Sequence, residues 1–165
     1  MSLKDELLSE IDSAFEGVAL DGGVSLDQSK VIDSYGEGVT EEEFNKIPKK
    51  EVTNDWRKIP FYILDEADCI AHLDAKGFKY YIPALMKRLV ENYDPSSMMS
   101  IGTLSVLYPK KANYNYSSER YSLLSKKQCV AIAHYLKELP NLVCLEAEDL
   151  KCVQRAFNNH WSKYV

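Results

Sequence analysis

The side chains that could bind a metal ion or transfer a proton gather in one acidic segment. Asp65, Asp68 and His72 are spaced so that a helix would place them on one face. Carboxylates and imidazoles serve as zinc ligands and as general acids and bases. No H-E-x-x-H or E-x-x-H pattern accompanies them. We therefore favour a structural interpretation, in which the two aspartates begin a helix and His72 lies near its end, and we expect neither a metal nor a cofactor.

A small enzyme with a site assembled between helices is the alternative. Its candidate acid, base or ligand groups are Glu66, Asp68, His72 and Tyr80. The sequence contains no G-x-S-x-G nucleophile elbow, no P-loop and no dinucleotide-binding fingerprint. This alternative would require these residues to converge in one pocket.

The segment 109–121 combines tyrosines with basic side chains and has no consistent helical period. It contains Tyr114, Tyr116 and Arg120 among lysines, asparagines and serines, so we expect a long surface loop. Tyrosine and arginine are typical of protein interfaces, and loops often carry function. The leading hypothesis is a non-enzymatic interaction domain that presents this loop, and the connection around Trp56, to another protein or to a second copy.

Three motifs combine aromatic residues with prolines or helix signals. They are Trp56-x-x-Ile59-Pro60, Gly77-Phe78-x-Tyr80-Tyr81-x-Pro83-Ala84 and Tyr121-Ser122-x-Leu124-Ser125-x-x-Gln128. Core packing accounts for most of these residues: Gly77 would form a turn with a positive φ, and Pro83 would begin the next helix. We nevertheless include Tyr80, from the second motif, among the candidate binding residues, with Trp56, Tyr114, Tyr116 and Arg120.

The three motifs resemble those of an uncharacterised bacterial family, a domain of unknown function. The resemblance extends from about Phe44 to Trp161, and residues 1–40 match it less well. It implies a helical fold of unknown function, often found as a lone domain, with no catalytic residue to transfer.

Apolar residues recur at helical spacing through most of the chain. Ser25 with Gln28, Thr40 with Glu43, and Ser125 with Gln128 have the spacing of capping boxes. The expected helices cover 3–18, 25–36, 40–47, 65–73, 83–94, 98–108, 125–140 and 150–161. The segment 98–108 also alternates like a strand, but no partner strand is visible. We predict an all-α single domain, an orthogonal or irregular bundle of about six to eight helices.

Composition and charge narrow the classes of partner. The 165 residues include 25 acidic and 20 basic side chains without a long run of either sign, which disfavours binding to nucleic acid through its phosphates. Only convergence of Lys110, Lys111, Lys126 and Lys127 with the tyrosine segment would create a surface for an anionic partner. No apolar run would span a membrane and no secretory signal is apparent. We expect a cytoplasmic protein with reduced cysteines.

Overall fold

The computed structural model of this chain describes residues 2–35, 40–47 and 54–165. All regular elements in these ranges are helical, which confirms the predicted all-α fold class. The α-helices are α1 (Leu3–Ala14), α2 (Leu26–Tyr35), α3 (Glu41–Asn45), α4 (Phe61–Asp65), α5 (Ala75–Asn92), α6 (Met98–Val106), α7 (Tyr114–Arg120), α8 (Lys126–Leu142) and α9 (Ala147–Asn159). Short 3₁₀ turns are η2 (Trp56–Lys58), η3 (Ile70–His72), η4 (Lys111–Asn113) and η5 (Trp161–Tyr164).

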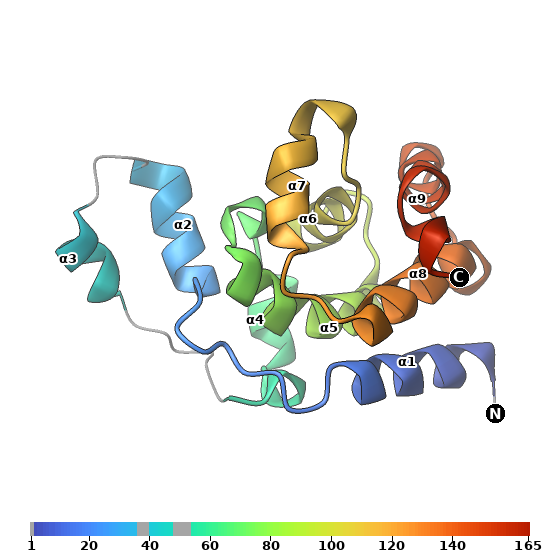
Figure 1. The fold of residues 1–165 in the computed structure, drawn as a ribbon, viewed down its shortest axis with the longest axis horizontal. Helices are drawn as coiled ribbons and strands as arrows, with labels where there is room; N and C mark the ends of the chain where they lie inside the picture. The colour runs from blue at the N-terminus through green and yellow to red at the C-terminus, as the bar shows by residue number, and fades with distance from the viewer. Residues whose placement is uncertain (1, 36–39, 48–53) are drawn as a thin grey trace.

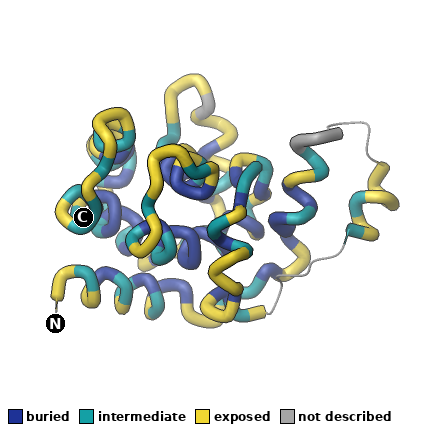
Figure 2. The backbone as a smooth tube through the Cα atoms, turned by 180° about the vertical axis from the view of Figure 1, so that it is seen from behind, coloured by how far each residue is buried: buried dark blue, intermediate teal, exposed yellow. Residues whose placement is uncertain are grey.

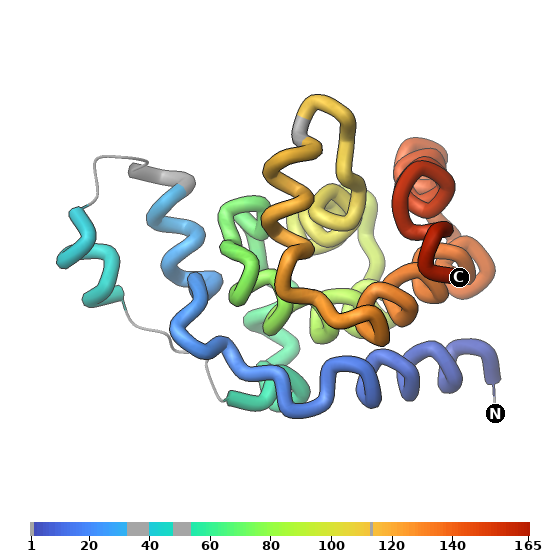
Figure 3. The backbone as a smooth tube through the Cα atoms, viewed as in Figure 1, coloured from blue at the N-terminus to red at the C-terminus, as the bar shows by residue number. Residues whose placement is uncertain are grey.

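The helices α5 and α8 form the centre of the bundle. Figure 1 shows α1 running beneath them, α6 and α7 above α5, and α9 with the C-terminal turn beside α8. The helices α2 and α3 lie at the flank, with α3 farthest from the centre (Figure 3). Buried residues concentrate along α5 and α8, whereas α3 is exposed or intermediate (Figure 2).

A single apolar core joins these helices. Its largest fully buried side chains include Phe15 after α1, Tyr81 of α5, Tyr135 of α8 and Trp161 of η5. The hydroxyls of the two tyrosines have hydrogen-bond partners inside the protein. The Tyr135 hydroxyl donates to the Met86 carbonyl at 2.7 Å, and the Tyr81 hydroxyl accepts from the backbone N–H of Leu26 in α2 at 3.3 Å. Burial of these two rings therefore leaves neither hydroxyl without a hydrogen bond.

Local capping signals position several helices as expected. Ser25 with Gln28 and Ser125 with Gln128 each form reciprocal side-chain and backbone hydrogen bonds, so both capping boxes are confirmed. Thr40 accepts from the backbone N–H of Glu43 at 3.1 Å. The ambiguous segment 98–108 is helical as predicted over Met98–Val106. The predicted end of the helix at Pro140 is wrong, because α8 continues through Pro140 to Leu142.

The predicted turn at Gly77 and helix start at Pro83 are wrong, because both residues lie inside α5. Asp74 begins the helix: its Oδ1 accepts from the backbone N–H of Gly77 at 2.8 Å and from that of Val24 at 2.9 Å. A Cβ on Gly77 would lie 2.4 Å from the Val24 carbonyl oxygen. Glycine is required here because the 24–25 backbone passes so close, and not because of a positive φ.

The predicted helix over 65–73 is also wrong. Asp65 ends α4, Asp68 lies outside any helix, and His72 is the last residue of η3. Cys69, between them, has a left-handed φ of 56°, which breaks a continuous helix. The three residues therefore do not share a helix face.

The predicted loop over 109–121 is the third error. Residues 111–113 form η4, and Tyr114–Arg120 forms α7. The only buried residue of α7 is Ser117, so this short helix has no apolar stripe that a periodicity argument could detect.

Candidate functional site

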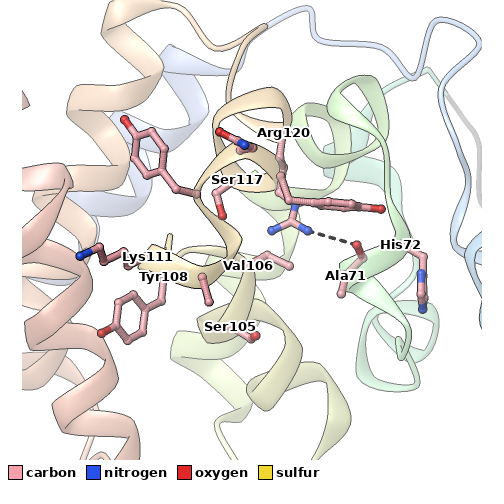
Figure 4. Close-up of a pocket in the computed structure, with 12 residues that line it drawn as sticks. Ala71, His72, Ser105, Val106, Tyr108, Lys111, Ser117 and Arg120 are labelled. Atoms are coloured by element: carbon pink, nitrogen blue, oxygen red, sulfur yellow. Dashed lines mark hydrogen bonds between the residues drawn. The ribbon is translucent and has the colours of Figure 1, made fainter.

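A cleft of about 520 Å³ lies where η3, the end of α6 and α7 meet. We call it the tyrosine cleft; it is lined chiefly by Ala71, His72, Tyr108, Lys111, Tyr114, Tyr116 and Arg120. Figure 4 shows Tyr108 and Lys111 on one side and Arg120, Ala71 and His72 on the other, with Ser105 and Val106 between them. The cleft brings three of the five predicted binding residues, Tyr114, Tyr116 and Arg120, into one place.

Arg120 is held in position at one wall of the cleft. Its Nη2 donates to the Ala71 carbonyl at 3.1 Å, the dashed bond in Figure 4, and its Cζ lies 5.9 Å from the centre of the Tyr116 ring. The Arg120 Nε is buried and has no hydrogen-bond partner among the described residues. The Nη groups, of which one donates to Ala71, are therefore the part of the guanidinium that retains donors for a partner.

The opposite wall carries a second cation. Lys111 is exposed, and the neighbouring Lys110 ammonium lies 5.7 Å from the Tyr108 ring centre. Within the described ranges, no carboxylate lies within 4.0 Å of Lys111 or Arg120, and no aspartate or glutamate lines the cleft. The charged groups facing the cleft thus favour an anion.

The two tyrosines of α7 present their rings to solvent. Tyr114 is 52% exposed and Tyr116 is 67% exposed. Both belong to a helix whose buried face is nearly absent, so their side chains are not needed to hold the core. Rings with this exposure can contribute apolar area and a hydroxyl to a partner.

The floor of the cleft is fixed by long-range hydrogen bonds at the end of α6. The Tyr121 hydroxyl donates to the Val106 carbonyl, and the Trp161 indole N–H donates to the Leu107 carbonyl at 2.7 Å. Burial raises the pKa of Tyr121 well above its usual value, so it stays a donor at neutral pH. The floor is therefore rigid in comparison with the exposed rings.

Two of the predicted binding residues lie elsewhere. Tyr80 is fully buried, with its ring centre 4.8 Å from that of Tyr81. Trp56 is 2% exposed, and its indole N–H donates to the Phe15 carbonyl at 2.9 Å. Both side chains therefore contribute to the core.

Trp56 also borders a second cleft, of about 440 Å³, between α1, α4 and α5. Its cations are already engaged: Lys87 pairs with Asp12 at 2.8 Å, and Arg88 forms two hydrogen bonds to Asp65 at 2.6 and 2.9 Å. The bonds from Arg88 lower the pKa of Asp65, so this ion pair persists well below neutral pH. The second cleft thus offers mainly apolar contact.

The residues of the alternative enzyme site are not gathered in the tyrosine cleft. His72 lines the cleft, but Glu66, Asp68 and Tyr80 are not among its lining residues. One carboxylate oxygen of Asp68 is buried without a hydrogen-bond partner, a feature that the sequence did not indicate. In the described part of the chain, no group of three His, Cys, Asp or Glu side chains could hold a metal ion.

The sequence indicated some of the cleft and missed the rest. The predicted convergence of four lysines is not met: Lys111 lines the cleft with Tyr114, Tyr116 and Arg120, whereas Lys110, Lys126 and Lys127 are not among its lining residues. Lys127 instead donates to the Ser13 hydroxyl at 2.9 Å, on the side of α1. Residues 71 and 72 come from η3, residue 105 from α6 and residue 108 from the segment just after α6. Tertiary packing brings them to the cleft; of the four, the sequence singled out only His72, and for a different site.

None of the helices in the described ranges is long and apolar enough to cross a membrane.

Three comparisons with known proteins bear on the identity of the chain. Searches among curated proteins and among solved structures find no significant match. The model of one family matches residues 3–165, which includes the N-terminal helices as well as all three motifs. The chain therefore belongs to DUF6714, a family of unknown function.

Proposed function

We propose that this chain is a non-enzymatic protein-interaction domain whose partner docks in the tyrosine cleft. The observation that carries the proposal is the convergence of exposed Tyr114 and Tyr116 with an oriented Arg120 in one hollow. Aromatic residues and arginine supply most of the binding energy at protein interfaces, and they do so best from a pre-formed pocket. A cytoplasmic location is part of the proposal, and the thiols of Cys129, Cys144 and Cys152, which form no disulfide among the described residues, support it.

The test compares capture of proteins by the wild-type chain and by Tyr114→Ala and Tyr116→Ala, in the cells that produce it. A partner identified by mass spectrometry should bind at least about tenfold less to these variants, because each removes a ring from the cleft. Tyr62→Ala is the matched control, since Tyr62 is 64% exposed and lies on α4, away from the cleft.

Self-association is tested separately by sedimentation over a concentration series. A dimer that depends on Tyr116 would identify the partner as a second copy. If neither a heterologous partner nor a dimer depends on Tyr114 or Tyr116, the proposal is wrong.

A further inference from the structure

We infer that the tyrosine cleft binds an acidic peptide segment of its protein partner, with apolar residues of that segment lying along α6. The inference rests on the proposed function and specifies the chemistry of the partner. It follows from the charge of the cleft, from the free bonding capacity of its cations and from an exposed apolar face that leads into it.

The charge of the cleft is opposite to that of the whole chain. The sequence has a formal net charge of −5, yet the charged side chains at the cleft are Lys111 and Arg120. The Debye length in the cell is about 8 Å, so a partner side chain in the cleft responds mainly to these two cations. An acidic side chain is attracted to these two cations, whereas the net negative charge of the chain does not favour its binding elsewhere.

The cations retain capacity to bind a carboxylate. Arg120 is oriented by the Ala71 carbonyl and by Tyr116, while Lys111 has no hydrogen-bond or ion-pair partner among the described residues. A guanidinium binds a carboxylate through two parallel hydrogen bonds, and the neighbouring Tyr114 and Tyr116 hydroxyls can add further ones. Because Arg120 is already held, little side-chain entropy is lost on binding.

An apolar strip on α6 extends the cleft. Met98 is 58% exposed and Ile101 is 43% exposed. Ile101 follows Met98 by three residues and precedes Ser105 by four, so all three lie on one face of α6. Ser105 in turn lines the cleft. At 1.5 Å per residue the strip is about 10 Å long, which matches about two turns of a partner helix or three residues of an extended peptide.

Two features argue against a polyanion such as nucleic acid as the occupant. The net charge of the chain would repel a long phosphate backbone, whose binding requires several phosphates to be neutralised. The exposed Met98 and Ile101 side chains would also gain nothing from a sugar-phosphate surface. A short segment that combines carboxylates with apolar side chains uses both parts of the site.

The experiment is selection from a random peptide display library against the full chain, followed by affinity measurement on the enriched peptides. We expect the enriched peptides to be rich in Asp and Glu beside Leu, Ile, Phe or Met. Their affinity should fall about tenfold or more in Arg120→Gln and in Lys111→Gln, and should weaken between about 50 and 500 mM salt. Arg155→Gln, at an exposed arginine of α9, is the charge-matched control and should bind as the wild type does.

The outcomes separate this inference from the proposed function. Peptides that depend on Tyr116 but show no acidic enrichment, or that bind Arg120→Gln and Lys111→Gln normally, would overturn the inference and leave the interaction domain standing. Failure to enrich any peptide that depends on the cleft would count against both. Equal binding of single-stranded oligonucleotides, lost in the same variants, would show that any anion suffices and would also overturn the inference.

Discussion

Three side chains of the first and third sequence motifs, together with Trp161, donate hydrogen bonds to carbonyls at the ends of distant helices. The last carbonyls of an α-helix have no partner within the helix and need one from elsewhere. The donors reach the ends of α1 and α6: Trp56 to the Phe15 carbonyl (2.9 Å), Gln128 to Ala14 (3.1 Å), Tyr121 to Val106 and Trp161 to Leu107 (2.7 Å). The motifs are therefore explained by the fold, whereas Tyr114 and Tyr116 lie outside them.

This role of Trp56 predicts the effect of removing its N–H. Trp56→Phe keeps an aromatic ring but removes the indole donor from the Phe15 carbonyl, which then accepts only from the backbone N–H of Val18 at 3.2 Å. We expect the free energy of unfolding to fall by about 0.5–1.5 kcal/mol, plus the cost of the smaller ring. Urea unfolding measures this change. Tyr62→Phe, at an exposed position, should leave the midpoint unchanged.

His160 makes the stability depend on pH. Burial, and secondarily Lys163, lower its pKa from 6.5 to about 4, beside the rings of Tyr121, Trp161 and Tyr164. The folded state thus keeps the imidazole neutral, while the unfolded chain takes up a proton as the pH falls below 6.5. The free energy of unfolding should therefore decrease between about pH 6.5 and 4, on the order of 1–2 kcal/mol after allowance for partial exposure.

Thermal melts of the wild type and of His160→Gln across this range test the assignment. The variant should lose most of the slope between pH 6.5 and 4. Below pH 4 both proteins should still lose stability. The hydrogen bonds from Arg88 lower the pKa of Asp65 in the folded state, so Asp65 is protonated, and its ion pair with Arg88 lost, only at more acidic pH. An unchanged slope in the variant would assign the effect to another group.

At the level of elements, the sequence predicted helices wherever an amphipathic stripe and a local cap coincide. It succeeded for α8 and for the starts of α2 and α3, where Ser or Thr caps a nearby N–H. It also succeeded for α6, where the absence of a partner strand decided between helix and strand. It failed for α7, whose buried face is a single serine, and at Gly77, whose role depends on the distant Val24 carbonyl. Similarly, it identified the tyrosines and Arg120 of the cleft, but not the wall that η3 and α6 supply.

Two glycines within helices, Gly77 of α5 and Gly102 of α6, should respond differently to alanine. A Cβ at Gly77 would lie 2.4 Å from the backbone oxygen of Val24, whereas a Cβ at Gly102 would lie 3.0 Å from the terminal Cδ1 of Ile70. Alanine gains about 1 kcal/mol of helix propensity at each position. We expect Gly77→Ala to lower the free energy of unfolding by about 1–3 kcal/mol net, because the backbone at Val24 must move to make room for the methyl group. For Gly102→Ala, where only the end of the Ile70 side chain must move, we expect a free energy of unfolding within about 1 kcal/mol of the wild type.

Chemical denaturation of both variants provides the measurement, and each serves as the control of the other. Equal destabilisation would contradict the argument, because the helix propensity terms are the same. Gly102→Ala also tests how Arg120 is positioned in the tyrosine cleft. A displacement of Ile70 would shift η3, and with it the Ala71 carbonyl that accepts the hydrogen bond from Arg120.

At the level of the whole molecule, the packing is graded from the centre to the flank. The first helix inserts Leu7 and Ile11 into the core. Its polar side is held by the ion pair of Lys87 with Asp12 at 2.8 Å and by the Glu10 carboxylate, which lies 2.9 Å from Nδ1 of His134. In contrast, α3 has no buried residue, and its described link to the rest is a long bond of 3.4 Å from Gln28 to the Phe44 carbonyl. Local stability follows buried contacts, so these two helices should differ strongly.

Amide hydrogen exchange measures this gradient directly. Amides of α3 should exchange through openings of nearly zero free energy, while those of α5 and α8 should require global unfolding. Ile11→Ala, which leaves a cavity beneath α5 and α8, should lower protection in both by about 2–5 kcal/mol and leave α3 unaffected. Loss of protection in α8 alone would show that α5 and α8 open separately, because a single shared core requires the two helices to lose protection together.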